Sequence, residues 1–563
     1  MTVSEYLVDF LAEKGVSDVF GLPGGVILDF LYAVNQRSGI QAHLSYHEQS
    51  AGFAACGYAQ YKHSPGVAYA TRGPGFTNLI TAIADAYSDS LPVFFITAHS
   101  GKAVKSMMRF EKDQELDTVS MSSNITKYAS VIEDPASVPD EIERAYTAAM
   151  TGRKGPVLLD FSSQIWNKEV NEEFTANADP CNIYIPEMAV KTIIEILESA
   201  ERPLLLVGDG IRQSEITNIL AVLTAKWNIP VLSSRGSQDV GAICKNYYGY
   251  IGSHGIRYSN YIFTKADVVI SMGNRMAFPT DSQSFHQGLQ NKKIVWIDMD
   301  NNELGREIPN TIKIECDIKG LLPQLLTAKY RTTHANTWLD TCKHIKSKLF
   351  SSDTNQAVES LQNIFSLLGR QHIIVCDVGN NEFWGSRAYE LSGINNRILY
   401  SKSFGALGCA IGKSIGVQYA SKASVICLVG DQGFQLNIQE LQAIAQERLP
   451  IAIILLNNHS SGMIRDRENQ MYDGEYIHTT KTSGYGTPDF ETLARGYGIE
   501  FHSYHSMEEK DIRQVLDNLD APTLIEIELE EEIILTPNLP KGRTMQRMSP
   551  ELDEDILLEL DCL

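Results

Sequence analysis

The sequence predicts an α/β protein that contains three doubly wound parallel sheets. Three observations favour this fold class. Short apolar runs that read as strands alternate with helical patterns along the chain. Many of these runs end in glycine or an acidic residue, as strands of doubly wound sheets do. Two polar stretches, at about 167–185 and 330–360, interrupt the alternation and so separate three modules.

These interruptions predict the domain boundaries. We expect an N-terminal domain over 1–166, a central domain over 186–330, a C-terminal domain over 356–530, and an acidic, irregular tail over 531–563. The length of 563 residues suits three or four domains.

Composition and charge bear on the class of partner and on the compartment. The net charge of −21 argues against nucleic acid or an anionic membrane as a partner. The nine cysteines form no CxxC pair, which favours reduced, packed thiols. No run of 18 apolar residues exists, and the amphipathic N-terminus does not read as a targeting signal. We expect a cytoplasmic protein.

The N-terminal domain opens with a helix over residues 4–14, which Gly15 ends. Strand–turn–helix units follow, with glycine turns in Gly21–Leu28 and Thr71–Leu79. Glu48 stands at the head of a helix rich in small residues. By residue type alone it is most simply a capping acid that the helix dipole favours.

The most informative stretch is LVGDQGFQLNIQELQAIAQERLPIAIILLNNHSSGM, from Leu428 to Met463. It predicts a strand, a Gly-Asp turn, an amphipathic helix, and a second strand over 451–456 that ends in Asn457-Asn458. Asp431 and Asn458 follow two strands joined by one crossover, so they lie at the same sheet edge. Oxygen ligands there suit Mg²⁺ carrying a phosphate. Alternatively, Asp431 is only a helix N-cap and the Asn pair a turn.

This stretch resembles the signature of thiamine diphosphate enzymes, which is Gly-Asp-Gly followed after about one βα unit by Asn-Asn. Within them the chain looks most like the acetolactate (acetohydroxyacid) synthases, over nearly its whole length. One position departs from the signature, since Gln432 stands where a second glycine is usual. The resemblance implies three metal ligands, which are Asp431, Asn458 and Ser460. It also implies a set of cofactor-binding residues: Gly25, Gly379, Asn380, Gly430, Gln432, Gly433 and Met463.

The same resemblance assigns catalytic residues. Glu48, in a segment matching HEQxAxxxAxGYA, would hydrogen-bond a ring nitrogen of the cofactor's aminopyrimidine and favour its imino form. The Gly405 carbonyl would accept from the aminopyrimidine amine, and Leu407 would wedge between the two cofactor rings. Gln114 matches the family's FQExD stretch. In the family, the glutamate that corresponds to Glu48 reaches a cofactor held by the other subunit. The resemblance therefore implies a homodimer or tetramer with active sites at the subunit interface.

The central domain carries the family's FAD positions. Gly208-Asp209-Gly210 alone is too short to indicate a dinucleotide. Together with other matches it implies a structural FAD, because the chemistry needs no redox step. The matching positions are Gly208, His254, Gly273, Arg275, Asp298 and Asp317. The alternative is a relict sheet without flavin, as in flavin-free members.

The reaction that the resemblance implies begins with a 2-keto acid donor, expected to be pyruvate, that loses CO₂ with the cofactor as electron sink. The chain lacks the His-His pair of simple pyruvate decarboxylases, which favours ligation to a second carbonyl compound, the acceptor. Four positions of the acceptor pocket differ from the family: Asp113, Ser253, Pro279 and Arg467. With Lys127, we assign Asp113, Ser253 and Arg467 to substrate binding.

These differences predict a larger, more polar pocket and hence a bulkier polar acceptor, such as a keto-sugar nucleotide. Three alternatives stay open. The chain could be a true acetolactate synthase, a non-ligating 2-keto acid decarboxylase or lyase, or a non-catalytic paralogue.

Overall fold

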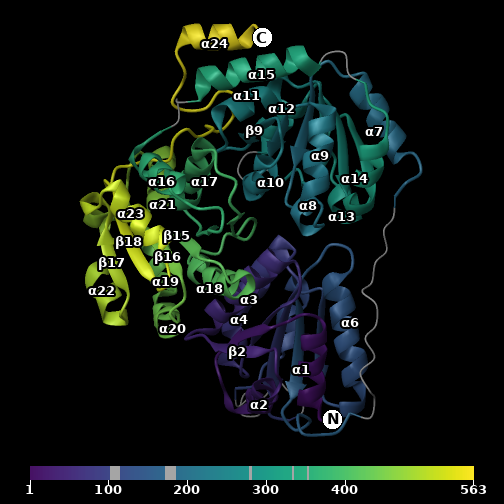
Figure 1. Cartoon of the computed structure of the whole chain (residues 1–563), viewed down its shortest axis with the longest axis vertical. Helices are drawn as coiled ribbons and strands as arrows, with labels where there is room; N and C mark the ends of the chain where they lie inside the picture. Colours follow the sequence, from purple (N-terminus) through teal and green to yellow (C-terminus); the bar gives the residue numbers. More distant parts are fainter. Residues whose placement is uncertain (102–113, 171–184, 278–281, 332–334, 351–353) are drawn as a thin grey trace. The chain divides into compact units, whose positions relative to one another are not determined.

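The computed structural model describes residues 1–101, 114–170, 185–277, 282–331, 335–350 and 354–563 (Figure 1). The chain divides into two compact units, which are taken in turn. The first comprises 1–181, 371–382 and 399–532, and holds two sheets. The second comprises 182–370, 383–398 and 533–563, and holds one.

The first sheet of the first unit has the order β2-β1-β3-β4-β6-β5, and its strand pairs are parallel. Its strands are β1 (Asp18–Gly21), β2 (Gln41–Leu44), β3 (Gly66–Tyr69), β4 (Val93–His99), β5 (Tyr128–Ile132) and β6 (Val157–Ser162). The central strands are buried on both faces, as their continuous apolar sequence requires. The helices are α1 (Val3–Glu13), α2 (Leu28–Gln36), α3 (Glu48–Lys62), α4 (Pro74–Asp89), α5 (Thr118–Ser122) and α6 (Val138–Met150).

The second sheet of this unit has the order β14-β13-β15-β16-β18-β17. Its strands are β13 (Ile373–Cys376), β14 (Ile398–Leu399), β15 (Val425–Gly430), β16 (Ile451–Asn457), β17 (Glu500–Ser503) and β18 (Thr523–Glu528). The helices are α18 (Cys409–Ser421), α19 (Asp431–Leu436), α20 (Leu441–Gln446), α21 (Gly462–Met471), α22 (Phe490–Tyr497) and α23 (Glu509–Asp517). Numbered within each module, both sheets read 2-1-3-4-6-5, so the two modules share one topology. The order reverses beside the first strand, which is where ligands bind in such sheets.

Helices α3 and α18 join the two modules of the first unit. Glycines allow their backbones to touch: an added side-chain carbon at Gly57 would lie 2.3 Å from the Lys413 carbonyl oxygen. One at Gly416 would lie 1.8 Å from the Ala54 carbonyl oxygen. A larger residue at either position would force the helices apart. The small residues of α3 therefore serve this close helix packing.

The sheet of the second unit has the order β12-β11-β10-β7-β8-β9, which is the 3-2-1-4-5-6 order of dinucleotide-binding folds. Its strands are β7 (Pro203–Val207), β8 (Val231–Ser233), β9 (Tyr247–Tyr250), β10 (Val268–Met272), β11 (Lys293–Asp298) and β12 (Thr311–Glu315). Its helices are α7 (Ala189–Glu198), α8 (Gly210–Gln213), α9 (Thr217–Trp227), α10 (Gln238–Ala242), α11 (Arg257–Lys265), α12 (Ser282–Leu289), α13 (Asn301–Leu304), α14 (Ile318–Thr327), α15 (Ala335–Leu349), α16 (Gln356–Ser366), α24 (Glu554–Asp561) and α17 (Asn380–Ser392), whose first residues belong to the first unit.

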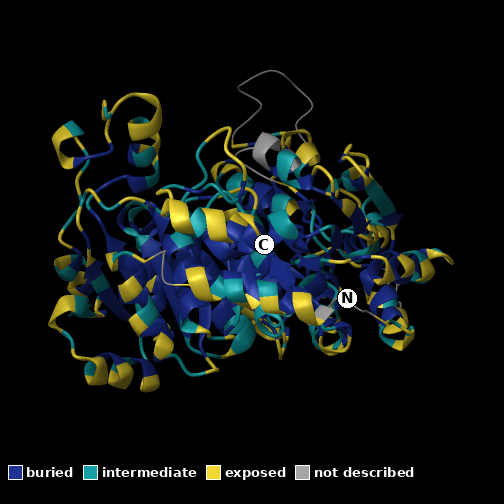
Figure 2. Ribbon diagram, turned by 90° about the horizontal axis from the view of Figure 1, so that it is seen from above, coloured by how far each residue is buried: buried dark blue, intermediate teal, exposed yellow. Residues whose placement is uncertain are grey.

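The prediction of three parallel α/β sheets is confirmed. Buried residues, dark blue in Figure 2, fill the interior, whereas many of the exposed residues, in yellow, lie on helices and loops. The cysteines that the structure describes are free thiols, and only Cys562 is exposed. The domain boundaries stay predictions.

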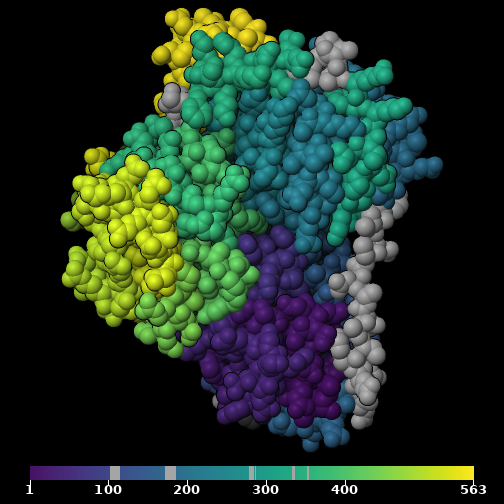
Figure 3. Space-filling view, in the orientation of Figure 1, coloured from purple at the N-terminus to yellow at the C-terminus, as the bar shows by residue number. Residues whose placement is uncertain are grey.

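Two sequence-based expectations differ from the structure. The helix expected after Asp431 is broken at Asn437, whose amide donates to the Gly408 carbonyl (2.9 Å) and whose side-chain oxygen accepts from Ser50 (2.6 Å). These tertiary bonds outweigh helix propensity there. The tail expected to be irregular ends in α24, which lies along α15 (Figures 1 and 3), where Glu559 contacts Lys348 at 3.0 Å.

Candidate functional site

Three strand ends of the second sheet gather the residues of the candidate site. Asp377 follows β13, Asp431 follows β15, and Asn458 follows β16, which pairs in parallel with β15. The Asp431 carboxylate accepts hydrogen bonds from the Gln432 N–H (2.8 Å) and the Ser460 N–H (3.3 Å). The predicted convergence of Asp431 with the Asn458–Ser460 turn is therefore present.

Unused polar atoms line this turn. Among the residues that the structure describes, the buried Asn458 Nδ2 and Asn380 Oδ1 atoms have no hydrogen-bond partner. Both side chains adjoin Gly462, where an added carbon would lie 2.8 Å from Asn458 Nδ2 and 3.1 Å from Asn380 Nδ2. Buried polar groups normally find partners. The turn thus has the form of a cradle for a polar ligand.

The electrostatics of the strand ends favour a cation. Burial raises the pKa of Asp431 to about 6, although N–H donors partly stabilise its charge. Burial likewise raises the pKa of Asp377 to about 6. A divalent cation beside Asp431 would offset the desolvation of its carboxylate. Among the described residues no cluster of three His, Cys, Asp or Glu could hold a metal, so a cation here needs amide, backbone or phosphate oxygens.

Gln432, the departure from the family signature, links the two loops. Its side-chain oxygen accepts a hydrogen bond from the Ser461 hydroxyl at 2.8 Å. The adjacent Gly433 is required by close packing, since an added carbon would lie 2.0 Å from Asp377 Oδ2 and 3.4 Å from Leu407 Cδ1. Leu407 therefore lies against the Gly433 turn, where the resemblance places it. Met463, half-buried, begins α21 with Gly462.

Gly405 and Gly379 both adopt left-handed backbone conformations, with φ of +69° and +120°. Gly405 is exposed and precedes Leu407 in the loop before α18. An added carbon at Gly430 would meet no atom closer than Asn381 Oδ1, at 3.5 Å. The loop backbone at Gly430 and Gly405 is thus open for a ligand to approach.

The first module gathers a second group of predicted residues. The buried Glu48 carboxylate accepts from the Asn78 amide at 2.9 Å, and its other oxygen would lie 3.3 Å from a carbon added at Gly75. Gln114 is exposed and packs its backbone against Gly73. Gly25 is exposed in the turn after β1. Glu48 and Gln114 therefore both lie against the Thr71–Leu79 segment.

Of the four residues predicted to bind substrate, three lie in the described part of the chain. Asp113 lies outside the described residues, as does Pro279. The Lys127 ammonium donates to the carbonyls of Thr151 (2.8 Å) and Arg153 (2.7 Å), which is a structural role. Arg467 is exposed on α21, whereas its neighbour Arg465 is buried and contacts Asp466 at 2.8 Å. The Ser253 hydroxyl lies 3.2 Å from His254 Nδ1, in the second unit.

The FAD positions fit a dinucleotide only in part. Gly208 and Gly273 directly follow β7 and β10, at the point where the strand order reverses. However, the Gly208 and Gly210 N–H groups donate to the carbonyls of Met272 and Gly273, each at 3.0 Å. Those two N–H groups are therefore not available to a phosphate.

Three further residues predicted to bind FAD, Asp298, Asp317 and Arg275, lie at or just after strand ends. Asp298 accepts from the Asp300 N–H at 2.9 Å, and Asp317 caps α14 through the Lys319 N–H at 2.8 Å. Arg275 is half-buried after β10, and its carbonyl accepts from Arg306.

His254 lies among aromatic and cationic side chains of the second unit. Its ring lies 4.4 Å from the Phe383 ring, which the Arg235 guanidinium also faces at 4.3 Å. Burial, with Arg235 and Arg387 nearby, lowers the pKa of His254 to about 4. The imidazole is therefore neutral at pH 7.

Sequence reasoning missed Asp377 and Glu440. Asp377 accepts from the Gly408 N–H (3.0 Å) and the Ala410 N–H (3.1 Å), which fixes the start of α18. The fully buried Glu440 accepts from the Tyr46 N–H at 3.0 Å, two residues before Glu48. Asp377 ends an apolar run, which could have flagged it. Glu440 gives no local signal.

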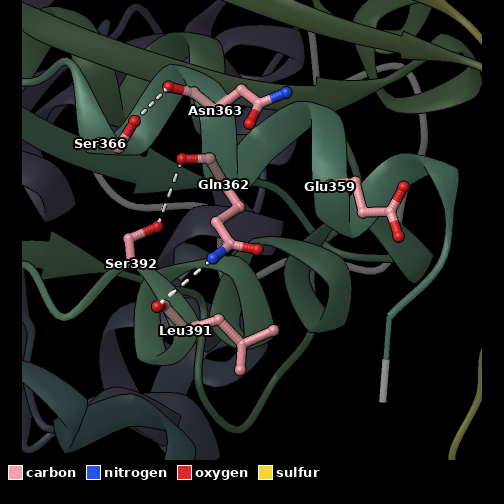
Figure 4. A pocket seen from close by; sticks show the side chains of 6 residues that line it. All are labelled: Glu359, Gln362, Asn363, Ser366, Leu391 and Ser392. Carbon is pink, nitrogen blue, oxygen red and sulfur yellow. Dashed lines mark hydrogen bonds between the residues drawn. The ribbon is translucent and has the colours of Figure 1, made fainter. Parts of the chain in front are cut away.

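A polar pocket elsewhere in the second unit has no comparable chemistry. Figure 4 shows its lining residues, which are Glu359, Gln362, Asn363, Ser366, Leu391 and Ser392. Several of their polar groups bond within the set: Gln362 donates to the Leu391 carbonyl at 3.4 Å, and Ser366 to the Asn363 carbonyl at 2.8 Å. We assign this pocket no function. In the described part of the chain, no helix is long and apolar enough to cross a membrane.

Comparison with known proteins agrees with this geometry. Residues 1–121 match the N-terminal TPP binding domain of thiamine pyrophosphate enzymes, 190–325 match their central domain, and 377–527 match their C-terminal TPP binding domain. The first and last of these matches contain Glu48 and Asp431, respectively.

Three relatives match almost end to end. The acetolactate synthase large subunit of Lactococcus lactis is 31% identical, covering 96% of this chain and 94% of the relative. That of Buchnera aphidicola is 30% identical, covering 97% and 98%. The isozyme 2 large subunit of Escherichia coli is 28% identical, covering 98% and 100%. The chain therefore belongs to the thiamine diphosphate enzymes of the acetolactate synthase type.

Proposed function

We propose that the protein is an acetolactate synthase that requires thiamine diphosphate and Mg²⁺. It would decarboxylate pyruvate and join the remaining two-carbon unit to a second 2-keto acid. The observation that carries the proposal is the cradle of Asp431, Asn458 and Asn380 beside β13 and β15. Its orphaned amide atoms and buried carboxylate fit a metal-bound diphosphate.

The chain's own residues have separate tasks. Thiamine diphosphate, when bound, supplies the electron sink for loss of CO₂. Asp431 and Asn458 would hold Mg²⁺, with Ser460 contributing its carbonyl oxygen, because the Ser460 N–H and hydroxyl already donate to Asp431 and Thr479. Glu48, oriented by Asn78, would exchange a proton with the aminopyrimidine. Leu407 would exclude water beside Gly433.

The exposed surface of the first unit supports a homodimer as the smallest active form. Large apolar side chains stand exposed next to the predicted site segments. They are Leu28 and Tyr32 after the Gly25 turn, Tyr46 before Glu48, Phe404 beside Gly405, and Leu436 after Asp431, with exposures between 38% and 64%. Such a set favours burial against a second copy. Glu48 and the Asp431 cradle would then meet across that interface.

FAD belongs to the proposal as a structural cofactor. The 3-2-1-4-5-6 strand order and the strand-end acids Asp298 and Asp317 support it, whereas the occupied N–H groups of Gly208 and Gly210 do not. Visible flavin absorbance of the purified protein tests this part. Its absence would favour the relict sheet.

The chemical identity of the acceptor is the last part of the proposal. The acetolactate synthase relatives favour a 2-keto acid, and the three relatives named above give no support to the keto-sugar nucleotide predicted from the four pocket differences. A bulkier anionic acceptor is the second candidate because two cations, Arg235 and Arg387, flank His254 in the second unit.

One assay tests both candidates. The purified protein is given thiamine diphosphate, Mg²⁺ and pyruvate, while CO₂ and acetolactate are measured. Acetolactate formed in a 1:1 ratio to CO₂ is expected from the main proposal. Slow CO₂ release that a phosphate-bearing ketone accelerates, without acetolactate, would favour the second candidate. Free acetaldehyde as the product would instead indicate a non-ligating decarboxylase.

A further inference from the structure

A buried polar chain inside the first unit connects α4, α18 and the loop before α18. Lys413 Nζ lies 2.8 Å from Asp85 Oδ2, and both side chains are fully buried. The other carboxylate oxygen of Asp85 accepts from the Ser401 hydroxyl at 2.5 Å. The order of contacts is therefore Lys413, Asp85 and Ser401.

Ser401 passes this restraint to the loop that carries Gly405. Its hydroxyl oxygen accepts from the Gly405 N–H at 3.2 Å and from the Ala406 N–H at 3.4 Å. Gly405 has a φ of +69°, which glycine adopts readily because it has many accessible conformations. The conformation of this loop therefore has to be fixed by hydrogen bonds from elsewhere. A second carboxylate of α4, Asp89, accepts from the Lys402 N–H (2.8 Å) and the Ser403 N–H (3.0 Å). Helix α4 thus holds the first three residues of the loop through two carboxylates.

The ion pair is locked in place by the helix packing around it. The Lys413 backbone touches Gly57 of α3, where an added carbon would lie 2.3 Å from the Lys413 carbonyl oxygen. Burial alone would lower the pKa of Lys413, but Asp85 raises it above its ordinary value, so the residue stays charged. The backbone of α18 at Lys413 is therefore held against α3.

Stability does not explain such a pair. Replacing a buried ion pair with apolar residues of similar volume is often neutral or stabilising, since both charges lose their hydration. A geometric task explains it better. The Asp85 carboxylate must stay in one position to accept the hydrogen bond from Ser401. The Lys413 ammonium compensates its charge in a site that excludes water.

We propose that Asp85, Lys413 and Ser401 are positioning residues, which hold the Ser401–Ala406 loop so that the Gly405 backbone meets the aminopyrimidine of the cofactor. The proposal rests on the proposed function, because it assumes that thiamine diphosphate binds here. It adds residues from two distant parts of the chain to the residues that shape this site.

Two double variants separate positioning from stability. K413M/D85N and K413M/D85L both remove the ion pair and both charges. Only the asparagine keeps an oxygen that can accept from the Ser401 hydroxyl. S401A removes the hydroxyl alone, and S401T, which keeps it, is the conservative rescue. The readouts are the Kd of Mg²⁺–thiamine diphosphate by calorimetry, the near-ultraviolet circular dichroism of the bound cofactor, and the melting temperature.

We expect K413M/D85N and S401T to bind the cofactor within about threefold of wild type. K413M/D85L and S401A should bind the cofactor at least about tenfold more weakly and should show an altered dichroism band. The melting temperature of K413M/D85L should equal that of K413M/D85N, and that of S401A should equal that of S401T. Equal affinity across all four variants would overturn the proposal. So would losses of affinity that follow the melting temperature. If wild type itself binds no thiamine diphosphate, the proposed function fails first.

Discussion

Replacing Glu440 with glutamine should make the protein less sensitive to alkaline pH. The Glu440 side chain is fully buried, and it accepts from the Tyr46 N–H in the segment that leads to Glu48. Burial raises the pKa of Glu440 to about 8 from its ordinary 4.5. Glutamine keeps an oxygen for Tyr46 but has no proton to lose. The variant should therefore be folded and active.

The magnitude follows from proton linkage. A carboxyl whose pKa is raised on folding contributes its full stability below pH 4.5 and loses it as pH rises towards 8. The shift of about 3.5 units corresponds to about 5 kcal/mol over that window. Between pH 6 and pH 9, wild type should lose about 2.5 kcal/mol relative to E440Q. Asp377 and Asp431 titrate alike in both proteins, so their effects cancel in the difference.

The assay is urea denaturation of wild type and E440Q at pH 6 and pH 9. The control is E447Q, which changes an exposed acid in the same segment and should show no pH-dependent difference. If the difference in the free energy of unfolding between E440Q and wild type is the same at pH 6 and pH 9, the reasoning is refuted. A loss of stability between pH 6 and pH 9 that is larger in E440Q than in wild type would also refute it, because it has the opposite sign to a raised pKa of Glu440.

Other predictions concern the cradle and the acceptor. Gly462→Ala should weaken cofactor binding about tenfold or more, since its side chain would lie 2.8 Å from Asn458 Nδ2; calorimetry that detects no change would contradict this. Leu407→Ala should lower kcat about tenfold, or ~1.4 kcal/mol, with little change in cofactor Kd, and a kinetic assay with unaltered kcat would count against the wedge role. Arg467→Trp should raise acetolactate formation from pyruvate if the exposed arginine disfavours a 2-keto acid acceptor. An unchanged rate would remove Arg467 from the acceptor site.

The sequence predicted the parts of the site whose geometry follows from local rules. Asp431 and Asn458 converge because parallel strands joined by one crossover end at the same edge. Glu48 was predictable only through the family resemblance, since an acid at a helix start is normally a cap. The sheet class followed from the alternation of apolar runs.

Long-range polar pairing was not predictable. Glu440 contacts Tyr46 across 394 positions, and Lys413 contacts Asp85 within the packing of three helices. Lys413 gives no local signal of its burial, because its partner Asp85 lies in another module. The break at Asn437 was missed for the same reason, since its bonds to Gly408 and Ser50 form only in the folded protein.

Calorimetric titration of the purified protein with thiamine diphosphate, with and without Mg²⁺, tests the central claim most directly. The comparison is wild type against Asp431→Ala, with Asp489→Ala, an exposed helix cap, as the matched control. The account predicts Mg²⁺-dependent binding of one cofactor per chain in wild type and in the control. It predicts a loss of about 100-fold or more in Asp431→Ala. Absence of binding in wild type, or equal affinity in Asp431→Ala, would contradict the account.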